Sequence, residues 1–268
     1  MALKIALGPA GSPGNSTLEG IPMIKEMGLQ TMEVQFSHGI GMGLPLAKKV
    51  GEEAKKMGIK LSVHAPFYIN LASKEKKKIE ESKKRILDSC ERMSIMGGGP
   101  VVFHPSYFSE RDTEEVFQTT KDAVLDMMQF IKKNKWNCKL APETTGKHSA
   151  LGSLDETIRL VKETGCFLCV DFAHLYARNY GKIDYEEVFD RLKPLKLEHL
   201  HCHFSGIKYT MKGEQKHINV GENKPPFEPL AKEILKRKLD ITIISESPIT
   251  WKDSLRMKGI FEKLGHKF

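Results

Sequence analysis

The chain has 268 residues, of which 40% are hydrophobic and 28% charged, a composition typical of one globular domain with a sizeable core. No run approaches the roughly 18 consecutive apolar residues of a membrane span, and residues 1–20 carry no processed-signal pattern. We therefore expect a cytoplasmic protein with no membrane partner. The net charge of +8 favours an anionic partner, and nucleic acid is the obvious candidate.

Short apolar runs alternate with longer amphipathic segments along the whole chain. The runs predict strands at residues 4–7, 31–36, 60–64, 101–104, 139–143, 167–171, 198–203 and 242–246. The intervening segments predict helices near 17–28, 44–58, 75–96, 113–135, 153–164, 184–193, 226–238 and 252–264. Eight such units without a domain-scale linker predict an α/β protein with a (β/α)8 TIM-barrel fold, a single domain over residues 1–268.

Turn and cap residues agree with this division. Gly28, Gly58 and Gly165 lie where helices should end, and Ser153 with Glu156 fits a capping box. An open doubly wound sheet is the alternative, but no G-x-G-x-x-G fingerprint follows the first strand. The closed barrel is therefore favoured.

Two conspicuous patterns have ordinary interpretations. Residues 74–85 mix lysines with glutamates at helical spacing, which favours a solvated helix face over a binding patch. The five cysteines are odd in number and scattered, so we expect reduced core residues. Cys166 and Cys169 form a C-x-x-C pattern within a strand-like run, where residues three apart point to opposite faces, so shared metal binding is not expected.

Histidines and carboxylates gather at or just beyond the predicted strand ends. They are His64, His104, Glu143, Asp171, His174, His203, His217 and Glu246. The carboxyl ends of barrel strands converge on one rim, where carboxylates packed together would repel unless a cation neutralised them. Mixed nitrogen and oxygen ligands without cysteine suit Zn²⁺, Mn²⁺ or Fe²⁺. The sequence therefore predicts a metal centre at this rim.

The seventh strand carries three histidines, His199, His201 and His203, that alternate and can face one side. Only His203 should reach the rim. His201 would lie one layer deeper, as a hydrogen-bonding group that supports a ligand or as a packed core residue.

At these residues the chain resembles the endonuclease IV family of apurinic/apyrimidinic endonucleases, which are xylose-isomerase-like TIM barrels. The motifs that carry the resemblance are His64-Ala-Pro-Phe-Tyr-Ile-Asn-Leu71, His104-Pro105, Pro142-Glu-Thr-Thr-Gly146, Val170-Asp-Phe-Ala-His174, His203-Phe-Ser-Gly-Ile-Lys208, His217-Ile-Asn-Val-Gly-Glu222 and Ser245-Glu-Ser-Pro248. They span residues 64–248 in the expected order. The first and the Asp-x-x-His segment are the most specific.

The resemblance implies a cluster of zinc ions. The first ion would take His64, His104 and Glu143. Glu143 would bridge to a second ion, completed by Asp171, His203 and Glu246. A third would take His174, His217 and an aspartate two residues before the latter, but this chain has Gln215 there, with Glu214 beside it. Either Glu214 supplies the carboxylate through a shifted loop, or the third site is weak or empty, which leaves two to three ions.

The resemblance also implies the activity: hydrolysis of double-stranded DNA 5′ to an abasic site in base excision repair, by a monomer, with Glu143 orienting the nucleophile. Phe67 would supply the aromatic that the family uses after its first histidine, and Lys208, Lys212 and Lys216 are candidates for phosphate contacts. The family's DNA-reading loop after strand two is replaced by residues 37–43, which contain no Arg or Trp. Its histidine-containing turn after strand one is replaced by residues 7–10.

A second enzyme class stays open. Metal-dependent sugar isomerases and epimerases of the same superfamily need only a few carboxylates and a histidine, which Glu143, Asp171, His203 and Glu246 would provide. A catalytically inactive metal-binding or nucleic-acid-binding protein is the third possibility. Metal stoichiometry and salt-dependent DNA binding discriminate among them.

Overall fold

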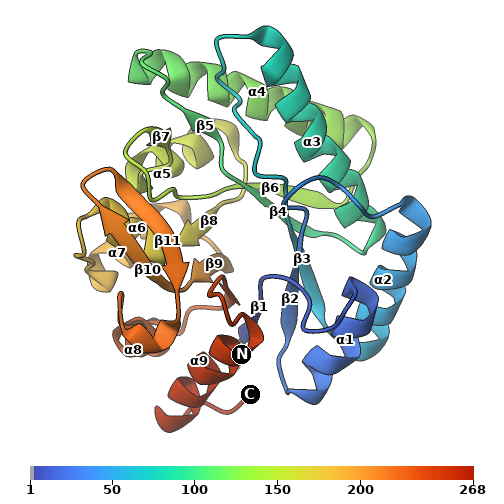
Figure 1. Cartoon of the computed structure of the whole chain (residues 1–268), viewed down its shortest axis with the longest axis vertical. Coiled ribbons are helices and arrows are strands. Elements are labelled where there is room, and N and C mark those ends of the chain that lie inside the picture. The colour runs from blue at the N-terminus through green and yellow to red at the C-terminus, as the bar shows by residue number, and fades with distance from the viewer. Residues whose placement is uncertain (1–2) are drawn as a thin grey trace.

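The computed structural model describes residues 3–268 and forms a barrel of parallel strands enclosed by helices (Figure 1). The barrel strands are β1 (Ile5–Pro9), β2 (Thr31–Gln35), β3 (Lys60–His64), β4 (Gly99–Phe103), β6 (Cys138–Pro142), β8 (Cys169–Asp171), β9 (Leu200–Phe204) and β12 (Ile241–Ser245). All eight predicted strands are present, which confirms the TIM-barrel prediction. The first two residues of the expected domain lie outside the described part.

Strand pairing closes the barrel. Two parallel runs have the orders β1-β12-β9-β8 and β2-β3-β4-β6. They are joined on one side by the Gly11 amide, which donates to the Glu33 carbonyl at 2.8 Å, and on the other by the Thr144 amide, which donates to the Cys169 carbonyl at 3.1 Å. A Cβ on Gly8 would overlap the Thr31 carbonyl, so glycine lets β1 approach β2 this closely.

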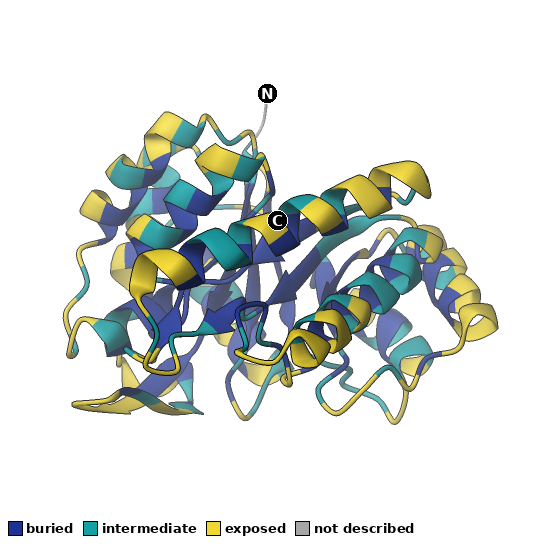
Figure 2. Ribbon diagram, turned by 90° about the horizontal axis from the view of Figure 1, so that it is seen from above, coloured by how far each residue is buried: buried dark blue, intermediate teal, exposed yellow. Residues whose placement is uncertain are grey.

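The outer helices are α1 (Thr17–Glu26), α2 (Leu44–Met57), α3 (Lys76–Ile95), α4 (Thr113–Lys133), α5 (Leu154–Thr164), α7 (Tyr185–Leu192), α8 (Phe227–Arg237) and α9 (Trp251–Lys263). Their inner faces pack on the strands and their outer faces are exposed (Figure 2). Gly58 and Gly165 cap α2 and α5 with φ of 70° and 76°, and the capping box of Ser153 and Glu156 is present, as predicted. Among residues 3–268, no helix has the length and apolarity needed to cross a bilayer.

The two patterns that were given ordinary interpretations behave as expected. The charged stretch forms the exposed side of α3, where Lys78 and Lys84 pair with Glu75 and Asp88. All five cysteines are free, and all but the half-buried Cys138 are buried.

Several elements were not predicted. A short helix, α6 (Phe172–Arg178), directly follows β8, and a two-stranded pair is formed by β5 (Ser106–Tyr107) and β7 (Ala150–Leu151). Short 3-10 turns, η1 (Lys193–Leu195) and η2 (Val220–Glu222), connect later elements. The segment after β9, for which the sequence predicted neither strand nor helix, is an antiparallel hairpin of β10 (Gly206–Thr210) and β11 (Gly213–Ile218), turning tightly at Gly213 with φ of 93°. His217 therefore lies on a strand rather than in a loop.

Candidate metal centre

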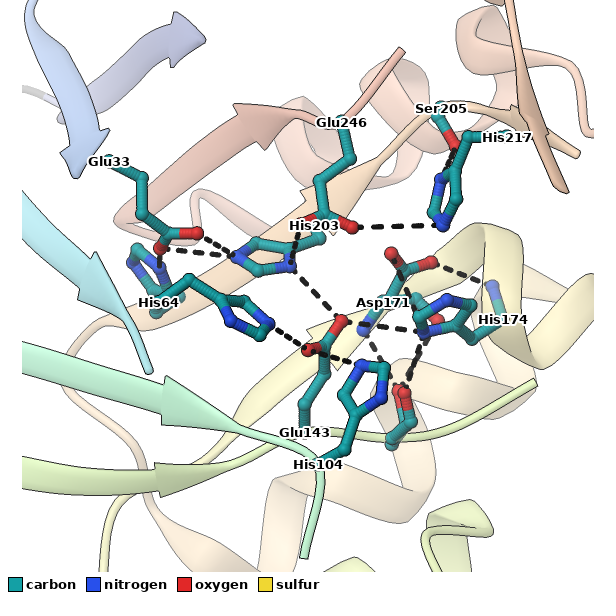
Figure 3. A network of polar contacts seen from close by, with 12 residues as sticks. Glu33, His64, His104, Glu143, Asp171, His174, His203, Ser205, His217 and Glu246 are labelled. Atoms are coloured by element: carbon teal, nitrogen blue, oxygen red, sulfur yellow. Dashed lines mark hydrogen bonds and ion pairs between the residues drawn. The ribbon is translucent and has the colours of Figure 1, made fainter. Parts of the chain in front are cut away.

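The predicted ligands meet at the carboxyl ends of the barrel strands (Figure 3). His64 and Asp171 are the last residues of β3 and β8, and His203 is the last but one of β9. His104, Glu143 and Glu246 directly follow β4, β6 and β12, while His174 lies on helix α6 and His217 on strand β11. These eight residues form three overlapping groups, and within each group one nitrogen or carboxylate oxygen per residue lies within 4.8 Å of the others.

The first group contains His64, His104 and Glu143. The Nε2 atoms of His64 and His104 lie 3.3 Å and 3.1 Å from the same oxygen, Oε2 of Glu143. His64 is also bonded through Nδ1 to the Ala65 backbone carbonyl at 2.7 Å, which assigns the proton to Nδ1 and leaves the Nε2 lone pair for the group. Two imidazoles and a carboxylate oxygen therefore converge on one point.

The second group contains Glu143, Asp171, His203 and Glu246. Here Glu143 uses its other oxygen: Oε1 lies 3.1 Å from Nδ1 of His203, and the same Nδ1 lies 3.4 Å from Oε1 of Glu246. Glu143 is fully buried and presents one oxygen to each of the first two groups. It is thus placed to bridge two cations.

The third group contains His174, His217 and Glu246. Nε2 of His217 lies 3.9 Å from Oε2 of Glu246, while its Nδ1 is bonded to the hydroxyl of Ser205 at 2.6 Å. Of the two residues considered for the missing carboxylate, Glu214 points into the group, with Oε2 3.3 Å from Nε2 of His174. Gln215 is exposed.

A β-bulge explains why Glu214 rather than Gln215 faces inward. In the hairpin, Lys208 is opposite Lys216 and Tyr209 is opposite Glu214, so Gln215 has no partner on β10. The extra residue shifts the alternation of side chains, which brings residues three apart onto one face. Gly146 completes the arrangement, because a Cβ there would come within 2.6 Å of the Glu214 Cβ.

The donor set fits divalent cations. Within residues 3–268, Oδ2 of Asp171 and Nε2 of His174 are buried without a hydrogen-bond partner, although buried polar atoms are nearly always paired. The 3.3 Å approach of Glu214 to that Nε2 lacks hydrogen-bond geometry. Both of these atoms belong to the groups above, whereas Nε2 of His148, the third such atom of the described residues, does not. Histidine nitrogens with carboxylate oxygens are typical zinc ligands.

The electrostatics of the centre follow from burial and from the mutual charges. Burial raises the pKa of Glu143, but the imidazoles of His203 and His104 outweigh it and hold that pKa well below its usual value. Burial lowers the pKa of His64, yet Glu143 raises it to about 9. The pKa of Asp171 is raised by burial and by the nearby carboxylates. A proton on His64 and a bound cation are thus alternative ways to balance the charge of Glu143.

One supporting residue was missed from the sequence. Glu33 on β2 is fully buried and accepts from His201 Nε2 at 3.1 Å and from Ser62 Oγ at 2.8 Å. His201 therefore lies one layer below the rim and bonds to a carboxylate, which agrees with the expected hydrogen-bonding role rather than with that of a packed core residue. Nothing in the local sequence of β2 distinguishes Glu33 from an ordinary strand residue.

The residues expected to contact DNA lie around the centre in two places. Phe67 is 50% exposed, and its ring centroid lies 5.7 Å from that of His64, beside the first group. Lys208, Lys212 and Lys216 are exposed on the hairpin. Since His217 faces the centre, Lys216 and its cross-strand partner Lys208 point to the opposite face of the ribbon. Their contact with phosphate stays a prediction.

Comparison with known families assigns the chain to a superfamily. The model of the xylose isomerase-like TIM barrel matches residues 21–259. The chain belongs to this family. A relative of uncharacterised function in Methanocaldococcus jannaschii is 30% identical over 98% of both chains. A protein named probable endonuclease 4 from Mycobacterium leprae is 29% identical over 66% of this chain and 69% of its own length.

Solved structures of two enzyme types share the fold. The endonuclease IV of Thermus thermophilus superposes with a TM-score of 0.74 at 18% identity, covering 97% of this chain and 99% of that one. A D-tagatose 3-epimerase-like protein superposes with a TM-score of 0.72 at 20% identity, covering 96% of each chain. At such identities the likeness concerns the fold, so the substrate has to be argued from the site.

Proposed function

We propose that this protein is a metal-dependent phosphodiester hydrolase that cleaves double-stranded DNA 5′ to abasic sites. The observation that carries the proposal is the first group: His64 and His104 converge on one oxygen of Glu143, whose other oxygen serves the second group. Two adjacent cation positions that share a carboxylate suit the two sides of an in-line displacement at phosphorus. The net charge of +8 and the endonuclease-type relatives agree with an anionic polymer substrate.

Each residue has a role in this proposal. His64, His104 and Glu143 would hold one ion, and Glu143, Asp171, His203 and Glu246 a second. His174, His217 and Glu214 would hold a third. Zinc is the expected ion, with manganese or iron as alternatives; when bound, such ions acidify water and offset the charge of a phosphodiester. Glu143 would orient the attacking water, and the exposed Phe67 would contact the DNA beside the first group.

The direct test uses a duplex that contains one abasic site. Incubation with the zinc-loaded or manganese-loaded protein is expected to give incision 5′ to the site, visible as a shortened labelled strand on a denaturing gel. An undamaged duplex of the same sequence is the control. If protein with confirmed metal content incises neither with zinc nor with manganese, the proposal is wrong.

A sugar isomerase or epimerase is the second candidate. Glu143, Asp171, His203 and Glu246 form a complete group by themselves, and residues 37–43 contain no Arg or Trp that would read DNA. Replacing His104 by alanine separates the two. It removes a ligand of the first group only, so it should abolish incision but would leave a one-ion sugar enzyme with its metal and its turnover.

Substitution of the hairpin lysines is a second way to distinguish a nuclease from a sugar enzyme. If Lys208 and Lys216 bind phosphates, alanine at each should reduce the slope of log Kobs against log salt by about 1 for duplex DNA. Because the two like charges lie directly opposite each other on the ribbon, an anion between them would also relieve their repulsion.

A matched control is Lys133→Ala at the end of α4, since helices run antiparallel to the strands and end at the far side of the barrel. An unchanged slope in the Lys208→Ala and Lys216→Ala variants would place the DNA elsewhere on the rim.

A further inference from the structure

Glu33 is a buried carboxylate below the metal centre. Its side chain lies inside the barrel on β2, facing His203 on β9 (Figure 3). It belongs to none of the candidate cation groups and has no exposed surface. A buried ionised carboxylate destabilises the fold unless its lone pairs accept hydrogen bonds. The groups that donate to Glu33 therefore indicate its role.

Four donor groups surround the Glu33 carboxylate. Ser62 Oγ and His201 Nε2 lie 2.8 Å and 3.1 Å from Oε2, and Gln35 Nε2 lies 3.1 Å from Oε1. His203 Nε2 lies 3.0 Å from Oε1 and 3.2 Å from Oε2. An ionised carboxylate can only accept, and it offers about four lone-pair positions, so all four groups can donate to it at once.

The contact with Glu33 determines the tautomer of His203. Because Nε2 donates to Glu33, it carries a proton, and in the neutral ring the lone pair must then be on Nδ1. That Nδ1 lies between Oε1 of Glu143 at 3.1 Å and Oε1 of Glu246 at 3.4 Å. A lone pair that faces two carboxylate oxygens is repelled unless a proton or a cation lies among them.

We propose that Glu33 is a positioning residue for this centre: it fixes the ring and tautomer of His203 so that Nδ1 is the ligating nitrogen. The proposal rests on the proposed metal centre. It adds a residue outside the ligand set, and it links the second cation group to β2, which supplies no ligand itself. Supporting hydrogen bonds of this kind typically change metal affinity by roughly 10–100-fold.

The test compares the same substitution at Glu33 and at a glutamate outside the centre. Glu33→Gln keeps the shape but offers one acceptor oxygen in place of two, so it cannot receive all four donors. We expect the second zinc ion to bind about 10–100-fold more weakly in competition against a chromophoric chelator. Glu233→Gln makes the same change in a mostly buried glutamate of α8 that pairs with Arg237, so its zinc affinity should match the unaltered protein. Circular dichroism checks that both variants fold.

A second measurement reads the tautomer itself. In the zinc-loaded, histidine-labelled protein, long-range ¹H–¹⁵N spectra should show His203 protonated at Nε2 and zinc-bound at Nδ1, with its signals assigned by their loss in His203→Gln. The reverse pattern would overturn the proposal even if Glu33→Gln failed to fold. Equal zinc affinity in Glu33→Gln and the unaltered protein would also overturn it, whereas an unaltered protein that binds no zinc would contradict the metal centre as a whole.

Discussion

Replacing Glu143 by glutamine is expected to abolish catalysis and to cost the protein at least one bound ion. Its two oxygens each serve a different group, with Oε2 3.1 Å from His104 and Oε1 3.1 Å from His203. An amide is a poor zinc ligand and carries no charge to balance the surrounding imidazoles. The loss of metal affinity should therefore exceed roughly 100-fold, the upper end of the range for substitutions of residues that only support a ligand. Incision assays and metal analysis on the same preparation measure both effects.

A control substitution separates this effect from general damage. Glu233→Gln on α8 alters another mostly buried glutamate, one that pairs with Arg237 at 2.6 Å far from the strand ends. It should leave metal content and activity unchanged. Full metal occupancy and normal activity in Glu143→Gln would show that the bridging role is wrong. The test addresses the site and not the substrate, because a sugar isomerase would need the same carboxylate.

The ligand set could be predicted because one topological rule links distant positions. In a parallel barrel every strand ends at the same rim, so residues as far apart as His64 and Glu246 become neighbours without any knowledge of the packing. The structure does bring all eight predicted residues together, and it places Glu143 between two of the groups.

Residues whose role depends on contacts inside the barrel could not be predicted in this way. Glu33 occupies an ordinary alternating strand, and its partners Ser62, His201 and His203 are 29, 168 and 170 residues away. Strand periodicity tells which face a side chain takes, but not which strands meet across the interior.

Short elements near the rim were missed for a local reason. Helix α6 has 7 residues and begins directly after Asp171, its N-cap, whose side chain accepts from the His174 amide at 2.7 Å. A helix of two turns shows too little periodicity to be told from a loop. The same Asp171 therefore caps the helix that carries His174, which links the second and third groups through the backbone.

The bulge in β11 leads to the sharpest prediction about the third ion. Glu214→Gln should remove one metal equivalent, because Oε2 of Glu214 lies 3.3 Å from the buried and otherwise unpartnered Nε2 of His174. Burial raises the pKa of Glu214, but His174, His104 and His217 outweigh burial and hold that pKa below its usual value. The carboxylate is therefore ionised and suited to a cation. Metal analysis by mass spectrometry should show the difference against the unaltered protein, with incision reduced in parallel.

Gln215 supplies the matched comparison, since it occupies the position at which the resemblance to the endonuclease IV family implies an aspartate. Gln215→Ala should keep every ion, because this side chain is exposed and unpaired with β10. Gln215→Asp should not rescue Glu214→Gln, since the bulge turns residue 215 away from His174. If Gln215→Ala loses the ion and Glu214→Gln keeps it, β11 binds metal in a regular register and the bulge is not the device that supplies the carboxylate. The number of ions would then depend on residue 215, which would lie opposite Tyr209 while Lys208 stayed opposite Lys216.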